Sequence, residues 1–243
     1  MDRAELPVIY LARHSETAWS LTGQHTGLTD LLLTEVGEGN ARRLREVLTG
    51  LTFAKVFSSP LRRAGRTCEL AGFGSRAEVV RDLVEWDYGD YEGRRSVEIR
   101  MERPDWELFR DGCPGGESPQ QVAERADRVV DLVRSVSGNV LIFSSGHFLR
   151  MLAARWIGID ILGARSLMLS TASLSVLGYE HFKRPQSNFG TTLIICSAQK
   201  RTNEVVRSAR CLLSASCRNS KTSRSLSLNA IVQQTNDSPL PKT

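Results

Sequence analysis

Short apolar runs alternate with helix-forming segments along most of this chain, and that alternation constrains its fold more than any other feature. The runs predicted to be strands cover residues 8–12, 55–58, 78–81, 140–144 and 174–180. Apolar residues recur at helical spacing in residues 34–48, 61–71, 119–136 and 148–157. Strands that alternate with helices favour parallel pairing with helices on both faces. We therefore predict the α/β class, as a three-layer α/β/α fold with a mainly parallel sheet.

The chemical character of the chain changes after residue 182. Residues 183–243 carry 10 Lys/Arg and 2 Asp/Glu, for a net charge of +8, whereas residues 1–182 have a net charge of −3. One strand-like run in this segment, residues 191–196, suits an edge strand. We predict a domain over residues 1–196 and a basic, Ser-rich tail over residues 197–243 whose low hydrophobicity suggests disorder. The tail leaves open a loose anionic contact, but it lacks the aromatic residues typical of specific nucleic-acid binding.

The cysteine content and the length of the apolar runs limit the classes of protein to which this chain can belong. The five cysteines are odd in number and show no paired metal spacing, so we expect free thiols in a reducing compartment. No apolar run reaches 18 residues, and the first residues lack the layout of a signal peptide. We expect a cytoplasmic protein with no membrane span, no metal and no cofactor. Its oligomeric state stays open, with a homodimer as one option.

Arg13 and His14 directly follow the first predicted strand. Open α/β sheets bind ligands at this carboxyl edge. An imidazole can attack phosphorus and hold the phosphoryl group when nearby cations neutralise its oxygens, and Arg13 supplies one such cation. The pair alone is more typical of an ordinary structural histidine, so the functional interpretation depends on other segments.

Three further strand ends carry residues suited to phosphate chemistry. Ser59 and Pro60 predict a helix start, with Ser59 as the cap, Arg62 in the first turn near free amide groups and Arg63 facing solvent. Residues 85–93 crowd carboxylates, aromatics and glycines, and a carboxyl group beside Trp and Tyr suits a general acid. The fourth buried strand runs into the sequence Ser-Ser-Gly-His.

These segments resemble the motifs of the histidine phosphatase superfamily, the phosphoglycerate mutase-like phosphatases, in family order. The matching sequences are RHSETAW, GQHTGLTD, LTEVGEGNARRL, FSSPLRRAGRTCELAG, EWDYGDYEG, GGES and SSGHFLR, which span about residues 7 to 182. The resemblance implies that His14 is the phosphorylated nucleophile and that Arg13 and Arg62 bind the phosphoryl group. It also implies that Glu85 protonates the leaving oxygen.

Further positions follow from the same resemblance. Ser20, Thr26 and Tyr88 fall where related enzymes contact substrate. Where the family has Arg-His-Gly, this chain has Ser15, which we expect to crowd the site or to need an unfavourable dihedral angle.

The most serious departure is in the last motif, where the family reads Ser-His-Gly. Ser145 takes the place of the second pocket histidine, and His147, two residues later, matches a second, non-catalytic family histidine. Ser145 can still donate one hydrogen bond to substrate, but it supplies no imidazolium charge. Losing such a donor typically costs about 10²–10³ in rate.

The sequence as a whole predicts a metal-independent phosphomonoesterase that acts through a phosphohistidine on a small phosphorylated metabolite. Its motifs are most similar to the acid and sugar phosphatase branch, including sedoheptulose-bisphosphatase-like members. Three alternatives stay open: a non-catalytic phosphate binder, an interaction protein that uses the basic tail, and a phosphoglycerate mutase-type phosphotransferase. The short interval before GGES argues against the mutase. Residues 93–118 predict a lid over the pocket, although Trp106 and Phe109 would equally fit packing on the core.

Overall fold

The computed structural model describes residues 8–179 and 191–196, and the six strands of this part form one sheet in the order β3-β2-β4-β1-β5-β6. The strands are β1 (Ile9–Arg13), β2 (Lys55–Ser58), β3 (Ala77–Val79), β4 (Val140–Ser144), β5 (Leu174–Tyr179) and β6 (Thr191–Cys196). Strands β1 to β4 pair in parallel, and β5 and β6 join the β1 side in antiparallel. The predicted mainly parallel α/β sheet is confirmed, as is the edge strand over residues 191–196. The predicted tail, residues 197–243, lies outside the described residues.

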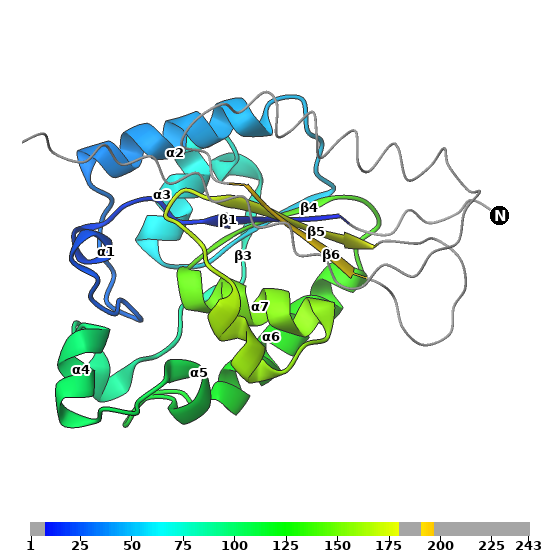
Figure 1. The fold of residues 1–243 in the computed structure, drawn as a ribbon. Helices are drawn as coiled ribbons and strands as arrows, with labels where there is room; N and C mark the ends of the chain where they lie inside the picture. The colour runs from blue at the N-terminus through cyan, green and yellow to red at the C-terminus, as the bar shows by residue number, and fades with distance from the viewer. Residues whose placement is uncertain (1–7, 180–190, 197–243) are drawn as a thin grey trace, which may run out of the picture.

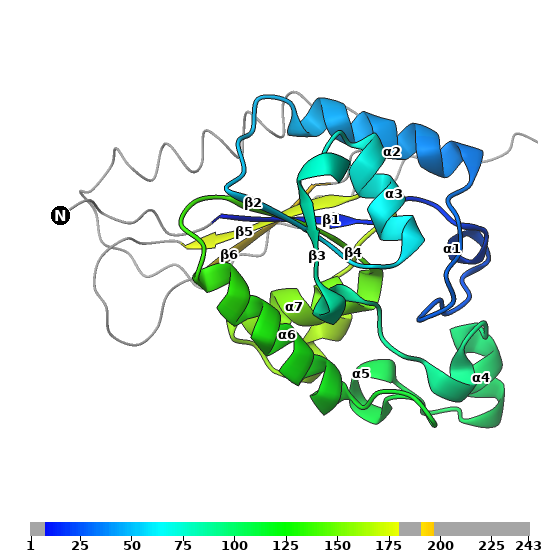
Figure 2. The same cartoon turned by 180° about the vertical axis from the view of Figure 1, so that it is seen from behind.

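Helices cover both faces of this sheet, as Figures 1 and 2 show from opposite sides, with α2 and α3 on one face and α6 and α7 on the other. The α-helices are α1 (Ala18–Thr22), α2 (Glu35–Leu48), α3 (Arg62–Leu70), α4 (Ser96–Glu102), α5 (Leu108–Asp111), α6 (Pro119–Arg134) and α7 (Gly146–Ile157). Short 3-10 helices are η1 (Gly74–Arg76), η2 (Arg81–Leu83), η3 (Gly89–Tyr91) and η4 (Ile161–Ser166). None of the helices in the described ranges is both long and apolar enough to cross a membrane.

Each face of the sheet has its own hydrophobic core, because successive strand side chains point to opposite faces. In β4, Val140 and Ile142 pack in the core beneath α6 and α7, whereas Leu141 and Phe143 pack beneath α2 and α3. All four side chains are fully buried. The continuous apolar sequence of β4 therefore reflects a strand that is covered on both sides.

Helix α6 begins where the sequence predicts, whereas helix α3 does not. Ser118 caps α6 and Pro119 occupies its first turn, as the sequence predicts. Helix α3 instead begins at Arg62, with Leu61 at the cap position and no capping side chain, so the predicted Ser59 cap is wrong. The reason lies in another loop: Asp30 Oδ1 accepts a hydrogen bond from the Arg62 backbone N at 2.7 Å. This carboxylate satisfies a free amide of the first turn, as a capping side chain would.

The segment between β3 and α6 contains α4 and α5, which lie at one end of the molecule (Figure 1). Trp106 and Phe109 are each 3% exposed, and their rings make edge contacts with Tyr91 and Trp86, both at 5.4 Å between centroids. These two aromatics therefore pack on the core, which was the alternative to their prediction as part of a lid over the pocket.

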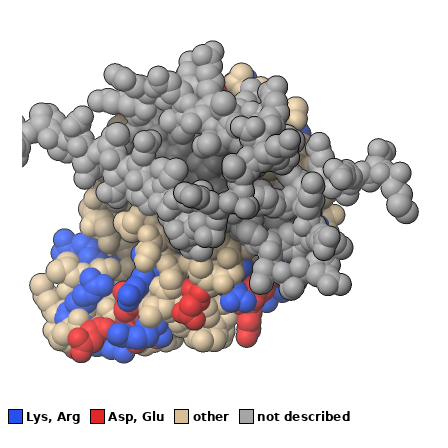
Figure 3. Space-filling model, turned by 45° about the vertical axis from the view of Figure 1, so that its right-hand side comes forward, with Lys and Arg blue, Asp and Glu red and all other residues tan. Residues whose placement is uncertain are grey.

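On the face seen in Figure 3, Lys/Arg and Asp/Glu side chains of the described residues intermingle. Ion pairs among the described residues include Arg94–Glu102.

Candidate active site

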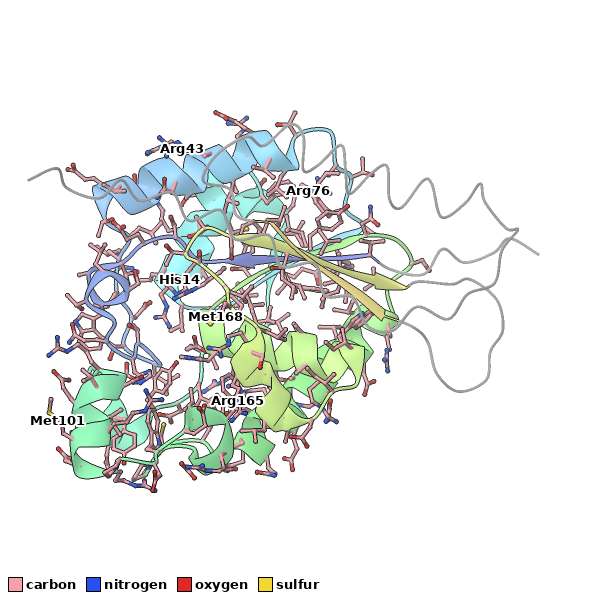
Figure 4. All side chains as sticks on the ribbon, viewed as in Figure 1. His14, Arg43, Arg76, Met101, Arg165 and Met168 are labelled. Atoms are coloured by element: carbon pink, nitrogen blue, oxygen red, sulfur yellow. The ribbon has the colours of Figure 1, made fainter. Side chains whose placement is uncertain are left out.

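The carboxyl ends of β1 and β4 meet at one edge of the sheet and position the candidate nucleophile. Arg13 is paired with Ser144 in the parallel register, and the backbone N of His14 donates to the Ser144 carbonyl at 2.8 Å. Figure 4 shows His14 just beyond the end of β1, on the side of the sheet where α1 lies. The first and last motifs of the sequence therefore come together at His14.

His14 is held as a neutral imidazole with one ring nitrogen committed. The ring is 4% exposed, and Nδ1 lies 2.7 Å from the Ser15 carbonyl oxygen. Because a carbonyl oxygen only accepts hydrogen bonds, Nδ1 carries the proton and Nε2 keeps its lone pair. Burial, together with the Arg13 and Arg63 guanidinium groups, holds the pKa of His14 well below its ordinary value. This state suits a nucleophile.

Arg63, not Arg62, is the α3 arginine that lies near His14. Its side chain is fully buried and donates to the carbonyl oxygens of Thr26, Gly27 and Thr29 at 2.8–2.9 Å. Arg62 is exposed and lines a shallow groove on the surface. The expectation that Arg63 faces solvent is therefore wrong, and this burial favours Arg63 over Arg62 as the candidate for the phosphate-binding role.

The helix start explains this correction. Since α3 begins at Arg62 instead of Pro60, its first turn is placed differently from the prediction. The sequence did contain a signal for the burial of Arg63. Positions four apart share a helix face, and Arg63 precedes Thr67, on the buried face of α3, by four residues. The other members of that buried face are Ala64 and Cys68.

Arg13 approaches the start of α7 closely because a glycine stands there. A Cβ atom at Gly146 would lie 3.0 Å from Arg13 Nε, tighter than nearly all real contacts. One terminal nitrogen of Arg13, Nη1, donates to the Leu169 carbonyl at 2.5 Å. Its Nε is buried without a hydrogen-bond partner. The guanidinium is therefore fixed in direction while its Nε donor remains unused.

Glu85 caps the N-terminus of α7. Its carboxyl group is 4% exposed, Oε1 accepts from the backbone N of Trp86 at 2.9 Å and of Phe148 at 2.7 Å, and Oε2 accepts from His147 N at 2.9 Å. A carboxylate here interacts favourably with the positive end of the helix dipole. Oε2 accepts one hydrogen bond, and the role of Glu85 as general acid stays a prediction.

Arg13 Nε, Arg63 Nε and Ser145 Oγ are buried without a hydrogen-bond partner among the described residues, as are Ser173 Oγ and Ser175 Oγ. Buried polar groups are normally paired, so these atoms require an explanation. Two of these atoms belong to guanidinium groups, which suit the acceptor oxygens of a phosphoryl group.

Ser15 does not crowd the pocket. Its hydroxyl donates to the Gly37 carbonyl in α2 at 2.6 Å, and its backbone N donates to Thr67 Oγ1 at 3.0 Å. Its φ is not in the left-handed region. Both parts of the expectation for Ser15 are wrong, because α2 offers the hydroxyl an acceptor away from the site.

Tyr88 and His147 form a buried pair beside these groups. Tyr88 is 1% exposed and its hydroxyl lies 2.6 Å from His147 Nδ1. Burial, with Arg150 and His25 nearby, holds the pKa of His147 well below its ordinary value, and burial raises that of Tyr88. The hydroxyl of Tyr88 and Nδ1 of the His147 ring therefore share one hydrogen bond, whose direction follows the tautomer of the ring. This bond occupies Nδ1 of His147, so the ring cannot use that nitrogen for the role of the histidine missing at position 145.

Two residues assigned to substrate contact serve their own loops in this structure. Ser20 Oγ donates to the Thr17 carbonyl and accepts from Thr17 N, which completes the cap of α1. Thr26 Oγ1 donates to the Gln24 carbonyl at 3.3 Å, and the Thr26 carbonyl accepts from Arg63. Their contact with substrate stays a prediction.

Comparisons with known proteins agree with this geometry. Residues 9–190 match the model of the histidine phosphatase superfamily (branch 1). The acid phosphatase of Mycobacterium tuberculosis is 40% identical over 188 residues, covering 76% of this chain and 92% of that protein. The sedoheptulose 1,7-bisphosphatase of Saccharomyces cerevisiae is 36% identical, covering 64% of this chain and 69% of that protein.

A solved structure extends the agreement to three dimensions. The product of an open reading frame of Mycobacterium tuberculosis superimposes with a TM-score of 0.69 at 39% identity, over 76% of this chain and 97% of that one. The family model covers the strand ends that carry His14, Glu85 and Ser145. The chain therefore belongs to the histidine phosphatase superfamily.

Proposed function

We propose that this protein is a metal-independent phosphomonoesterase that acts on small phosphate esters through a phosphohistidine. The observation that carries the proposal is that the neutral imidazole of His14 lies within the electrostatic reach of Arg13 and Arg63, each of which has a buried Nε without a partner. A phosphoryl group would satisfy these donors, and its phosphorus would then be within reach of Nε2.

The reaction proceeds in two balanced steps. In the first, the His14 Nε2 lone pair forms a bond to phosphorus, the ester P–O bond breaks, and Glu85 gives its proton to the leaving oxygen. Arg13 and Arg63 neutralise the phosphoryl oxygens during transfer. In the second, a water oxygen attacks phosphorus and the P–N bond breaks. Glu85 takes the proton from that water, so inorganic phosphate leaves and the enzyme returns to its starting state.

Sugar phosphates are the proposed substrate class. The relatives named above act, by their names, on phosphate esters in general or on a phosphorylated sugar. Ser145 offers a neutral donor where an imidazolium would balance the transferring charge. We expect turnover about 10²–10³ slower than that of a site with the histidine.

A non-catalytic phosphate-binding protein is the second candidate, and Ser145 is the observation that favours it. This protein would bind phosphate through the same donors without turnover. Hydrolysis of p-nitrophenyl phosphate at mildly acidic pH separates the two candidates, because only the enzyme releases nitrophenol.

The experiment compares wild type with His14→Ala, Ser145→His and Ser145→Ala. We expect slow wild-type turnover, no turnover and no acid-labile phosphoenzyme for His14→Ala, and a rate gain of about 10-fold or more for Ser145→His. Ser145→Ala is the matched control, because it removes the hydroxyl without adding an imidazole. Undiminished turnover by His14→Ala would refute the assignment of the nucleophile, and phosphate binding without turnover by any variant would favour the second candidate.

A further inference from the structure

Ser15 directly follows the candidate nucleophile and is tied to two helices. Its side chain is fully buried. The hydroxyl donates to the Gly37 carbonyl of α2 at 2.6 Å, and the backbone N donates to Thr67 Oγ1 of α3 at 3.0 Å. The remaining polar atom of Ser15, its carbonyl oxygen, lies 2.7 Å from Nδ1 of His14. The two ties to the helices therefore fix the residue that bonds the His14 ring.

The hydroxyl of Thr67 has only one arrangement that satisfies its neighbours. Thr67 is fully buried, and its Oγ1 donates to the Arg63 carbonyl at 2.7 Å. A hydroxyl has a single proton, so the same oxygen must accept the hydrogen bond from the Ser15 amide. Thr67 thereby connects the backbone that follows His14 to the backbone of Arg63, the candidate phosphate-binding cation.

Helix α2 holds the next peptide as tightly. A Cβ atom at Gly37 would lie 2.3 Å from the Glu16 carbonyl oxygen, so the start of α2 packs directly on this backbone. The backbone N of Thr34, the cap residue of α2, donates to the same carbonyl at 3.0 Å, and its hydroxyl donates to Glu16 Oε1 at 2.6 Å. Since α2 and α3 lie on one face of the sheet (Figure 1), residues 15 and 16 are held from that face.

The orientation of the Ser15 carbonyl matters for the chemistry of the imidazole. A neutral imidazole has two tautomers, and only the one with its proton on Nδ1 leaves a lone pair on Nε2. The Ser15 carbonyl selects this tautomer because it can only accept a hydrogen bond. Rotation of the Ser15 peptide would turn the carbonyl away, and the proton would then be free to move to Nε2.

We propose that Ser15 and Thr67 are positioning residues whose hydroxyl groups fix the Ser15 carbonyl and so keep the His14 proton on Nδ1. The inference rests on the proposed phosphohistidine chemistry, and it adds to that chemistry two residues that act through His14. It also gives a role to the departure from the Arg-His-Gly motif at position 15. The serine hydroxyl supplies a tie to α2 that glycine lacks.

Two measurements on the full chain test this role. Proton–nitrogen correlation NMR of the imidazole rings reports the tautomer, and His14→Gln identifies the His14 signals by their loss. We expect His14 in wild type to carry its proton on Nδ1 alone, and both Thr67→Val and Ser15→Ala to show a second population with the proton on Nε2. On p-nitrophenyl phosphate, kcat should fall by about 10-fold in each variant, as expected for one lost hydrogen bond, while KM changes little. Thr67→Ser keeps the hydroxyl and should restore both quantities.

Matched controls remove hydroxyls of the same geometry elsewhere. Thr49 Oγ1 donates to the Arg45 carbonyl four residues earlier at 2.8 Å, as Thr67 does to Arg63. Ser135 Oγ donates to the Leu132 carbonyl at 2.6 Å, which matches the length of the Ser15 bond. Both residues lie at exposed helix ends, so Thr49→Val and Ser135→Ala should leave the His14 tautomer and kcat unchanged.

The outcomes separate this role from a structural one and from the proposed function. A lower Tm in Thr67→Val and Ser15→Ala with an unchanged tautomer and unchanged kcat would overturn the inference while the phosphatase function stands. If wild type hydrolyses no ester, the phosphatase function fails, and NMR alone decides the inference. A proton that stays on Nδ1 of His14 in both variants would then overturn it. If Thr67→Val does not fold, Ser15→Ala, which lacks a single hydroxyl, decides by the same results.

Discussion

Replacing Arg63 by Met, with Arg62→Met as the matched control, tests which arginine of α3 belongs to the site. Arg63 makes three hydrogen bonds to carbonyls at 2.8–2.9 Å. Each bond from a charged donor contributes about 1.5–3 kcal/mol when removed singly. Water can reach part of this loop, because Thr26 and Thr29 are only half-buried. We therefore expect a loss of about 3–5 kcal/mol in the free energy of unfolding, less than the sum of three bonds.

Two assays measure the consequences. For a domain of this size, about 2–4 °C of Tm accompanies each kcal/mol, so thermal unfolding should shift down by about 6–20 °C. Below its new Tm, Arg63→Met should still lose about 10²–10³ in kcat/KM on p-nitrophenyl phosphate, because a donor to the transferring group is gone. Arg62→Met should change neither quantity. Equal activity losses in the two variants, or full activity in Arg63→Met, would refute the placement of Arg63 in the site.

Three further predictions follow from other contacts. Glu85→Gln should lower the free energy of unfolding by about 1–3 kcal/mol, since an amide nitrogen replaces an accepting oxygen. It should slow the hydrolysis of esters with poor leaving groups by about 10²–10⁴ and that of aryl esters far less. Equal slowing of both kinds of ester would indicate a structural role alone. Burial and Arg100 lower the pKa of His25 to about 4, so the unfolded chain takes up a proton that the folded chain resists, and stability should fall as pH drops from about 6.5 to 4. This pKa shift corresponds to about 3 kcal/mol of stability. The Tm of His25→Phe should therefore fall less steeply than that of wild type between these pH values. An equally steep fall of Tm with pH in both proteins would contradict the argument. A chain that ends at Ser197 keeps β6 and should keep its Tm, and a large drop would show that the tail contributes to stability.

The sequence predicted the central strands well because their signals are local. The ranges 55–58 and 140–144 coincide with β2 and β4, since an apolar run bounded by turn residues defines a buried strand. The short helices α1, α4 and α5 were not predicted. They have few apolar residues at helical spacing and are held by tertiary contacts, such as the ring of Trp106 after α4.

The site was predictable where a residue directly follows a strand and less so where a helix start decides its direction. His14 and Glu85 lie at the loops that the sequence indicated. Arg63 was assigned to solvent because the start of α3 depends on Asp30, a residue of a distant loop that satisfies the first amide of the helix.

The position of Glu85 has a consequence for how sequences of this kind are interpreted. Its carboxyl group stabilises the first turn of α7 whether or not a proton is ever transferred. A descendant that stopped hydrolysing esters would still be selected to keep this glutamate, because losing it would destabilise the helix. Retention of Glu85 is therefore weak evidence for catalysis in related chains. Position 145 is more informative, because its buried hydroxyl has no structural partner and its side chain is free to drift once turnover no longer matters.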